Sequence, residues 1–135
     1  MKREDGFYTM KGYALQENGD MTSAMEDYLE MIARLSLQTK DVRVSELSKM
    51  LHVKASSVTK MVQQLAQADL ITAEKYGDIL MTESGHKLGN YLLYRHDVLH
   101  QFLCLLNHSN NELEQVEKIE HFLDEQTIKN LELLN

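Results

Sequence analysis

The chain has 135 residues and a formal charge of −7, and its single cysteine excludes an intramolecular disulfide. An apolar fraction of 43% and a charged fraction of 26% fit one folded unit or two small lobes, and exclude a wholly disordered chain. No apolar run approaches the roughly 20 residues that cross a bilayer, so we expect a cytoplasmic protein without a membrane partner.

The charge is unevenly distributed along the chain. Residues 40–75 carry six Lys or Arg against four Asp or Glu, a local charge of +2, whereas residues 107–135 carry two against seven, a local charge of −5. A negative total charge disfavours DNA binding, because phosphate contacts are usually made by Lys and Arg. The positive segment nevertheless leaves a DNA-binding function open for the first half of the chain.

The first predicted helix follows an N-terminal arm. Residues 1–20 show no helical period, and the arm is assigned to residues 1–21. Apolar residues then recur at helical spacing over about 24–38, and Ser23 with Glu26 matches a capping box at the start of that helix.

Two further helices are predicted close together. Ser45 is expected to cap a short second helix, and a third helix follows almost at once with a buried stripe of Val58, Met61 or Val62, and Leu65. The other faces of the third helix are small and polar with one positive charge, which suits the major groove of DNA. Base or phosphate contacts are expected from Ser57, Thr59, Lys60 and Gln63, with Ser56 positioning the helix.

After the third helix the pattern changes to that of two short strands. The segments ITAEK and ILMT are joined by a turn at Tyr76, Gly77 and Asp78, which predicts a β-hairpin. Two helices at a short turn followed by a hairpin predict a winged helix-turn-helix, in which the second of the two helices enters the major groove. Lys75, beside the hairpin turn, is expected to help position the DNA backbone.

The last third of the chain is predicted to be helical. Gly85 is expected to separate the hairpin from a long helix over about 86–106, and two more helices are expected at about 111–123 and 125–134. Their apolar faces are too broad for so small a lobe to bury alone, so we expect a symmetric homodimer. The predicted fold is mainly α-helical with a small β-hairpin.

Acidic and histidine residues at helical spacing indicate a metal site. Asp27 and Glu30 are three residues apart, which puts both carboxylates on one side of the first helix. Glu117, Glu120 and His121 lie at i, i+3 and i+4, within about 100° of arc on one helical face. These five side chains are candidate metal ligands.

His96, in the sequence YRH of the long helix, is a sixth candidate ligand. Four carboxylates and two imidazoles without a thiolate form a hard donor set, which favours Mn²⁺ or a similar divalent ion. Two such ions would offset the charge of the four carboxylates and so reduce the repulsion of DNA. The alternative interpretation is a solvated acidic surface, which is common on helices.

Five segments, in their order and spacing, resemble the diphtheria toxin repressor (DtxR) family, specifically its manganese transport regulator (MntR) branch. They are MEDYLE, ASSVTKMVQQL, EKYGDILMTESG, YRH and VEKIEHFL, and the likeness covers about residues 22–130. It implies that the six candidates hold two metal ions between a DNA-binding and a dimerisation lobe. The iron-sensing branch typically has Met in place of Asp27 and Cys in place of Glu117, which favours Mn²⁺, with Fe²⁺, Co²⁺, Cd²⁺ or Zn²⁺ as substitutes.

The predicted domains are the N-terminal arm at 1–21, the winged helix-turn-helix DNA-binding domain at 22–85, and the helical metal-binding and dimerisation domain at 86–135. We expect a homodimeric, manganese-dependent repressor of manganese-uptake genes that binds double-stranded operator DNA and has no organic substrate. An iron-responsive regulator of the same family is the first alternative. A winged-helix regulator with an organic effector is the second, and it would need none of the six hard ligands. A di-metal hydrolase would need an open coordination position and a substrate cleft, so an enzyme is not expected.

Overall fold

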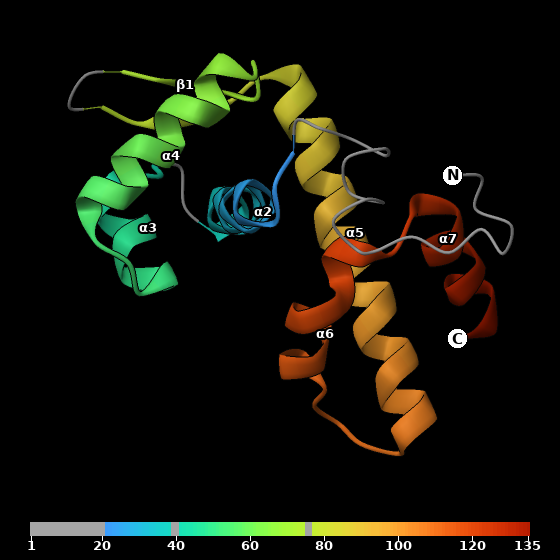
Figure 1. The fold of residues 1–135 in the computed structure, drawn as a ribbon. Coiled ribbons are helices and arrows are strands. Elements are labelled where there is room, and N and C mark those ends of the chain that lie inside the picture. Colours follow the sequence, from blue (N-terminus) through green and yellow to red (C-terminus); the bar gives the residue numbers. More distant parts are fainter. Residues whose placement is uncertain (1–20, 39–40, 75–76) are drawn as a thin grey trace, which may run out of the picture.

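The computed structural model describes residues 21–38, 41–74 and 77–135, so the predicted N-terminal arm, apart from its last residue Met21, lies outside it. The described part is mainly helical with one two-stranded antiparallel sheet, which confirms the predicted fold class (Figure 1). The elements are α2 (Ser23–Gln38), α3 (Val44–Leu51), α4 (Ala55–Gln67), β1 (Ile71–Ala73), β2 (Ile79–Met81), α5 (Glu83–Asn107), α6 (Leu113–Ile119), the 3₁₀ helix η1 (Glu120–Phe122) and α7 (Glu125–Leu134). No helix in these ranges is both long and apolar enough to cross a membrane.

The first two described helices are capped differently from the prediction. The backbone N–H of Met25 donates to Thr22 Oγ1 at 3.1 Å, so Thr22 caps α2 and the predicted cap at Ser23 is wrong by one residue. The predicted cap of α3 at Ser45 is also wrong. The extended residue before that helix is Arg43, whose side chain makes no capping hydrogen bond, and Ser45 lies in the first turn.

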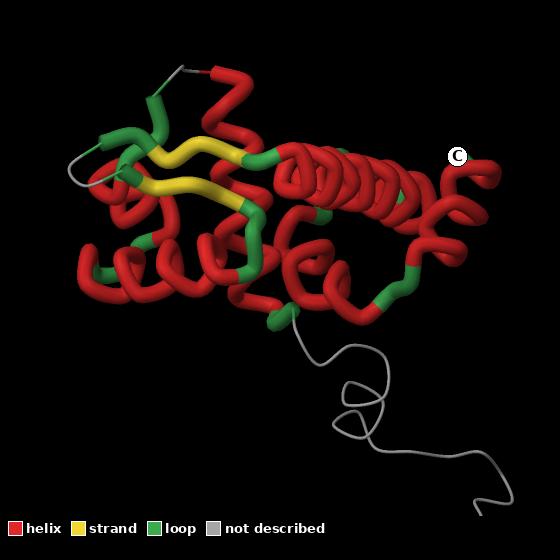
Figure 2. The backbone as a smooth tube through the Cα atoms, turned by 90° about the horizontal axis from the view of Figure 1, so that it is seen from above, coloured by secondary structure: helices red, strands yellow, loops and turns green. Residues whose placement is uncertain are grey.

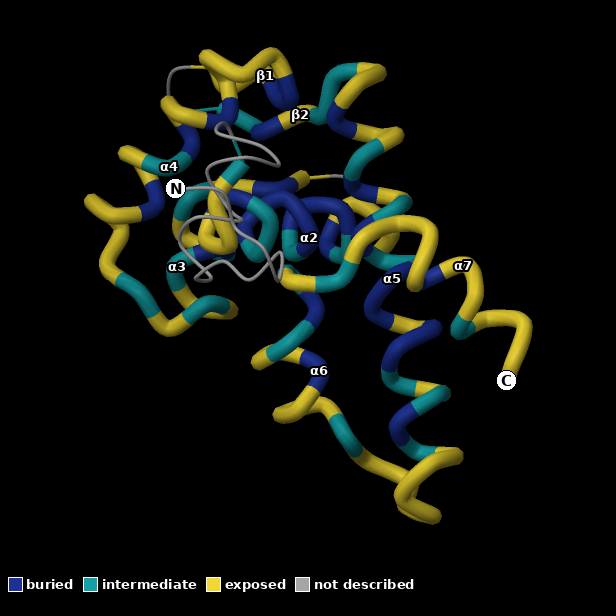
Figure 3. Tube along the Cα trace, turned by 45° about the vertical axis from the view of Figure 1, so that its right-hand side comes forward, coloured by how far each residue is buried: buried dark blue, intermediate teal, exposed yellow. Residues whose placement is uncertain are grey.

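The first hydrophobic core joins α2, α3, α4, the hairpin and the N-terminal half of α5. Helix α4 buries Val58, Val62 and Leu65, whereas Met61 is only partly buried, which decides the predicted stripe in favour of Val62. Helix α2 lies between the α3–α4 pair and α5 in Figure 1, and much of it is buried in Figure 3. Because α2 packs on both sides, it connects the predicted DNA-reading helix α4 to α5.

The hairpin leads directly into α5. Strands β1 and β2 pair with Ile71 opposite Met81, and Figure 2 shows them beside the start of α5. The helix begins at Glu83 rather than about 86, because the Thr82 hydroxyl accepts the Gly85 N–H at 3.0 Å. The prediction that Gly85 separates hairpin and helix is therefore wrong: Gly85 lies in the first helical turn.

The 25-residue helix α5 passes through two hydrophobic cores. The first core ends on α5 at Leu92, and the second begins at Leu99, where α5 packs against α6. Arg95 and His96 lie on α5 between these positions and are both buried. The predicted single helix over 111–123 is wrong, because α6 ends at Ile119 and the chain tightens into η1. A polar layer that contains the candidate ligands thus separates the two cores.

Candidate metal centre

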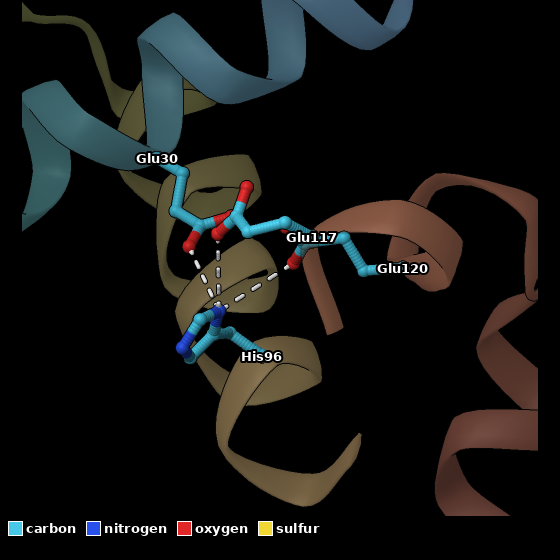
Figure 4. A group of neighbouring side chains, drawn as sticks. All are labelled: Glu30, His96, Glu117 and Glu120. Atoms are coloured by element: carbon cyan, nitrogen blue, oxygen red, sulfur yellow. Dashed lines mark ion pairs between the residues drawn. The ribbon is translucent and has the colours of Figure 1, made fainter. Parts of the chain in front are cut away.

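Four candidate ligands converge from four elements. Glu30 comes from α2, His96 from α5, Glu117 from α6 and Glu120 from η1, and one ligand atom from each lies within 4.8 Å of the others. Figure 4 shows the three carboxylates gathered around the imidazole. His96 Nδ1 lies 3.3 Å from Glu30 Oε2, 3.7 Å from Glu120 Oε1 and 3.9 Å from Glu117 Oε1. We call these four residues the first ligand group.

The first ligand group contains buried polar atoms without partners. Glu120 is fully buried, and neither of its carboxylate oxygens has a hydrogen-bond partner in the described part of the chain. The same holds for Glu30 Oε1 and His96 Nδ1. A buried carboxylate without a partner is strongly unfavourable, so such atoms need an explanation. A divalent cation among them would provide it, and the oxygen-rich donor set fits such an ion.

The crowding of negative charge is visible in the pKa values of this group. Burial, together with the nearby Glu120 carboxylate, raises the pKa of Glu30 to about 7. Burial and the same carboxylate raise the pKa of Glu117. Contact with Glu120 also raises the pKa of His96, because the negative charge favours the imidazolium. The raised pKa values mean that the crowded carboxylates of this group hold protons more readily, and a bound cation would take the place of those protons.

A second ligand group shares Glu120 with the first. Asp27, Glu120 and His121 each place one ligand atom within 4.8 Å of the others. His121 Nε2 lies 2.9 Å from Asp27 Oδ1, and His121 Nδ1 lies 2.7 Å from Glu26 Oε1. Burial by itself lowers the pKa of His121, but the hydrogen bonds with Asp27 and Glu26 outweigh it and raise that pKa to about 10. The two groups together comprise all six predicted ligands.

Local chain geometry explains why these side chains meet. Asp27 and Glu30 line the same cavity, so they lie on one side of α2, as their spacing predicts. The predicted helical relation among Glu117, Glu120 and His121 is altered, because η1 begins at Glu120 and a 3₁₀ helix turns about 120° per residue. Glu120 nevertheless belongs to both groups, so the change of helix type keeps the three side chains on the side facing α2.

A cavity of about 360 Å³ adjoins the first ligand group. Asp27, Glu30, His96 and Glu117 line it, together with Arg34 and the apolar side chains Met31, Leu51 and Leu113. The side chains of Asp27 and Glu117 are 41% and 55% exposed, whereas that of Glu30 is 8% exposed. The candidate ligands thus range from buried to solvent-exposed, so the outer members of the group are reachable from solvent.

The predicted DNA contacts lie on one exposed surface. Ser56, Ser57, Thr59, Lys60 and Gln63 are all exposed on α4, while Lys75 lies outside the described residues. Thr59 donates its hydroxyl hydrogen to Ala55 O at 3.1 Å, which leaves its oxygen to accept. Sequence reasoning did not single out Lys49 and Lys54 as contacts, although both line a groove that also contains Ser57. Their positive charge in the 40–75 segment is the sequence feature that makes them further candidates.

Two charged side chains beside the candidate ligands were also missed by sequence reasoning. Glu26 was interpreted as part of a helix cap, and Arg95 only as part of a motif. Arg95 Nη2 donates to Glu26 Oε1 at 3.1 Å, and the two side chains are 3% and 17% exposed. Their positions next to Asp27 and His96 in the sequence were the available indication.

Comparison with known proteins identifies the family. Residues 20–79 match the family model described as iron dependent repressor, N-terminal DNA binding domain. Residues 82–135 match the model for the iron dependent repressor metal binding and dimerisation domain. The chain belongs to the iron-dependent repressor family. This is the diphtheria toxin repressor family indicated by the motifs, and its members are DNA-binding transcriptional regulators, which agrees with the prediction of a regulator rather than an enzyme.

Named relatives and solved structures agree with this family. The chain is 44% identical over 103 residues to the HTH-type transcriptional regulator MntR of Geobacillus kaustophilus, covering 76% of this chain and 73% of the relative. It is 42% identical over 103 residues to MntR of Bacillus subtilis, covering 76% of this chain and 72% of that relative. The structure of the manganese regulator SloR aligns with a TM-score of 0.70 at 29% identity, and that of T. acidophilum IdeR with 0.66 at 25%. The chain spans 54% of the length of each of these two solved chains, and each alignment covers 84% of this chain.

Proposed function

We propose that this chain is a manganese-dependent transcriptional repressor of manganese-uptake genes, with two metal ions per subunit as corepressor. The observation that carries the proposal is the convergence of two ligand groups on the fully buried carboxylate of Glu120, whose oxygens have no hydrogen-bond partner among the described residues. The relatives named MntR and the manganese regulator SloR support the choice of effector. In this proposal all six residues, Asp27, Glu30, His96, Glu117, Glu120 and His121, are metal ligands.

The ligands lie where they can link metal binding to DNA binding. Asp27 and Glu30 belong to α2, which packs in the same core as the DNA-reading helix α4. Glu117, Glu120 and His121 belong to the C-terminal lobe. Bound cations would supply the positive charge that offsets carboxylate repulsion across this junction. Without that charge, Glu30 and Glu120 lie close together only at the cost of protonating Glu30, so α2 is held less firmly against α6 and η1.

The donor set favours manganese over thiolate-preferring metals. The six ligands comprise four carboxylates and two imidazoles, and Cys104 belongs to neither ligand group. Hard oxygen donors suit Mn²⁺, while Fe²⁺, Co²⁺, Cd²⁺ and Zn²⁺ are substitutes whose use depends on availability and geometry. An iron-responsive regulator with the same fold is the alternative, and it predicts a stronger response to Fe²⁺ than to Mn²⁺.

We further propose that the working unit is a homodimer on double-stranded DNA. The domain bounds in this proposal are 22–85 for DNA binding and 86–135 for metal binding and dimerisation. Exposed apolar side chains in the second domain, among them Leu105, Leu106 and Phe122, provide surface for self-association. A symmetric pair would present two α4 helices to successive major grooves about 34 Å apart.

The proposed function is tested by DNA binding at fixed salt. The probe is DNA from upstream of a manganese-uptake gene of the same organism, with chelator, with Mn²⁺ and, anaerobically, with Fe²⁺. We expect tight binding with Mn²⁺ that is lost with chelator and in Glu117→Ala. The matched control is Glu114→Ala, which removes an exposed carboxylate from the same helix. In the wild type that carboxylate pairs with Lys118 at 2.8 Å. Binding that is indifferent to metal would overturn the proposal.

Lys60→Ala is expected to weaken DNA binding similarly for all sequences. Lys60 is exposed on α4 and contributes one positive charge to its outer face. Loss of one phosphate contact lowers the slope of log affinity against log salt by about one. The control is Lys118→Ala, which removes the same charge from α6. Equal salt slopes for the two variants would contradict a DNA contact at Lys60.

A further inference from the structure

Glu26, Arg95 and His121 form a hydrogen-bonded cluster beside the second ligand group. Glu26 Oε1 lies 2.7 Å from His121 Nδ1 and 3.1 Å from Arg95 Nη2. The three residues belong to α2, α5 and η1, and each side chain is less than one-fifth exposed. One carboxylate oxygen is therefore shared by an imidazole from the C-terminal lobe and a guanidinium from the helix between the lobes.

Carboxylate oxygens lie within hydrogen-bonding distance of both imidazole nitrogens of His121. A carboxylate oxygen only accepts, so a separation of 2.7 Å requires His121 Nδ1 to donate. Arg95 Nη2 also lies 3.3 Å from His121 Nδ1, but Arg only donates, so both groups direct their hydrogens at Glu26. By the same argument Nε2 donates to Asp27 Oδ1 at 2.9 Å, so both nitrogens carry hydrogen in the metal-free protein. The hydrogen on Nε2, beside the second ligand group, is the one that a metal ion would replace.

We propose that Glu26, anchored by Arg95, is a positioning residue that fixes His121 so that Nε2 is the atom offered to a metal ion. The inference rests on the proposed function, because it concerns how a ligand of that site is oriented. A metal-bound histidine commonly donates its second N–H to a carboxylate, which fixes the tautomer and the ring orientation. Glu26 accepts hydrogen bonds from His121 and Arg95 on a single oxygen, Oε1. It belongs to neither ligand group in the described part of the chain.

A purely structural ion pair between α2 and α5 is the competing explanation. In that case loss of Glu26 would lower stability, but it would leave the choice of ring nitrogen unchanged. Glu26→Gln separates the two explanations, because its amide oxygen still accepts from Nδ1 although the negative charge is gone. Glu26→Ala removes the acceptor altogether.

The first test measures Mn²⁺ affinity from the electron paramagnetic resonance of free Mn²⁺. We expect Glu26→Ala to bind one of the two ions about 10- to 100-fold more weakly. Glu26→Gln retains most of the affinity, and Glu114→Ala, which removes an exposed carboxylate elsewhere, leaves both ions unaffected. Wild-type affinity in Glu26→Ala would overturn the inference while leaving the proposed function intact. Absence of Mn²⁺ binding to the wild-type protein would overturn the proposed function and this inference together.

The second test identifies the ligand nitrogen by NMR of protein loaded with an NMR-active cadmium isotope. In the wild type and in Glu26→Gln we expect cadmium coupling to His121 Nε2, with the ring hydrogen on Nδ1. In Glu26→Ala we expect this coupling to be lost or divided between the two nitrogens. Coupling to Nδ1 in the wild type, or an unchanged spectrum in Glu26→Ala, would overturn the inference even where that variant is less stable.

Discussion

Glu120→Gln is expected to abolish metal binding at both ligand groups while making the metal-free protein more stable. Glu120 is the residue that the two groups share, so its loss removes a ligand from each. We expect Mn²⁺ affinity to fall by more than about 100-fold, since even residues that only support ligands cost up to that much. In the metal-free protein, a neutral amide replaces a fully buried carboxylate that has no hydrogen-bond partner in the described part of the chain and is crowded by the Glu30 and Glu117 carboxylates, with His96 Nδ1 at 3.7 Å. Because the amide carries no charge to bury, the free energy of unfolding should then rise by about 1 kcal/mol.

The opposite signs of these two effects distinguish a ligand from an ordinary core residue. Free-Mn²⁺ resonance measures the affinity, and urea unfolding in the presence of chelator measures the stability. Glu114→Gln, on the exposed face of α6, should change neither quantity appreciably. Tight Mn²⁺ binding by Glu120→Gln, or a marked loss of metal-free stability, would contradict the assignment of Glu120.

Gly85→Ala is expected to lower the free energy of unfolding by about 3 kcal/mol. A Cβ atom at this position would lie 1.9 Å from the carbonyl oxygen of Leu70 and 2.9 Å from its carbonyl carbon. Backbone cannot move aside as a flexible side chain does, so the start of α5 would have to shift away from the hairpin. Thermal and urea unfolding of the metal-free protein measure the loss.

Ser84→Ala is the matched control for Gly85→Ala. It makes a substitution to the same residue one position earlier in α5, where the side chain is exposed, and should stay within about 0.5 kcal/mol of the wild type. If Gly85→Ala were as stable as this control, the close approach of α5 to Leu70 would be wrong.

Much of the fold was predictable because apolar periodicity and turn residues agree along this chain. The helix over 24–38 and the ITAEK–ILMT hairpin are close to α2 and the β1–β2 pair. The candidate ligands were predictable for the same reason, since helical spacing alone places Asp27 and Glu30 on one side of α2. The fold class and the family both follow from these local patterns and from the order of the motifs.

The remaining features depend on contacts between distant segments. The close approach to Leu70 that explains Gly85 involves a carbonyl 15 residues earlier in the chain, which no local pattern reveals. The Glu26–Arg95 pair joins residues 69 apart, so spacing on one helix says nothing of it. Likewise, helical periodicity did not indicate that the chain tightens at Glu120, although this residue connects the two ligand groups.

The position of the ligands between two cores suggests how a metal signal would reach DNA. The first core, which reaches α5 at Leu92, contains residues of α4, and the second core, which begins on α5 at Leu99, contains residues of α6. The charged layer between the two cores holds Glu30 and Glu120. A charged layer is easier to separate than a packed apolar one, because its residues gain hydration when it opens. We therefore expect the two cores to move relative to each other at the layer of candidate ligands.

The most direct test of this account measures Mn²⁺ affinity with and without DNA. Coupling between two sites is reciprocal, so DNA must raise Mn²⁺ affinity by the same factor by which Mn²⁺ raises DNA affinity. With the metal-responsive DNA fragment, taken from upstream of the manganese-uptake gene, at saturation, we expect the two factors to be equal and about 10-fold or greater. Unrelated DNA of the same length should give a smaller factor. Equal Mn²⁺ affinity in the presence and absence of that fragment would contradict the claim that metal at these residues controls DNA binding.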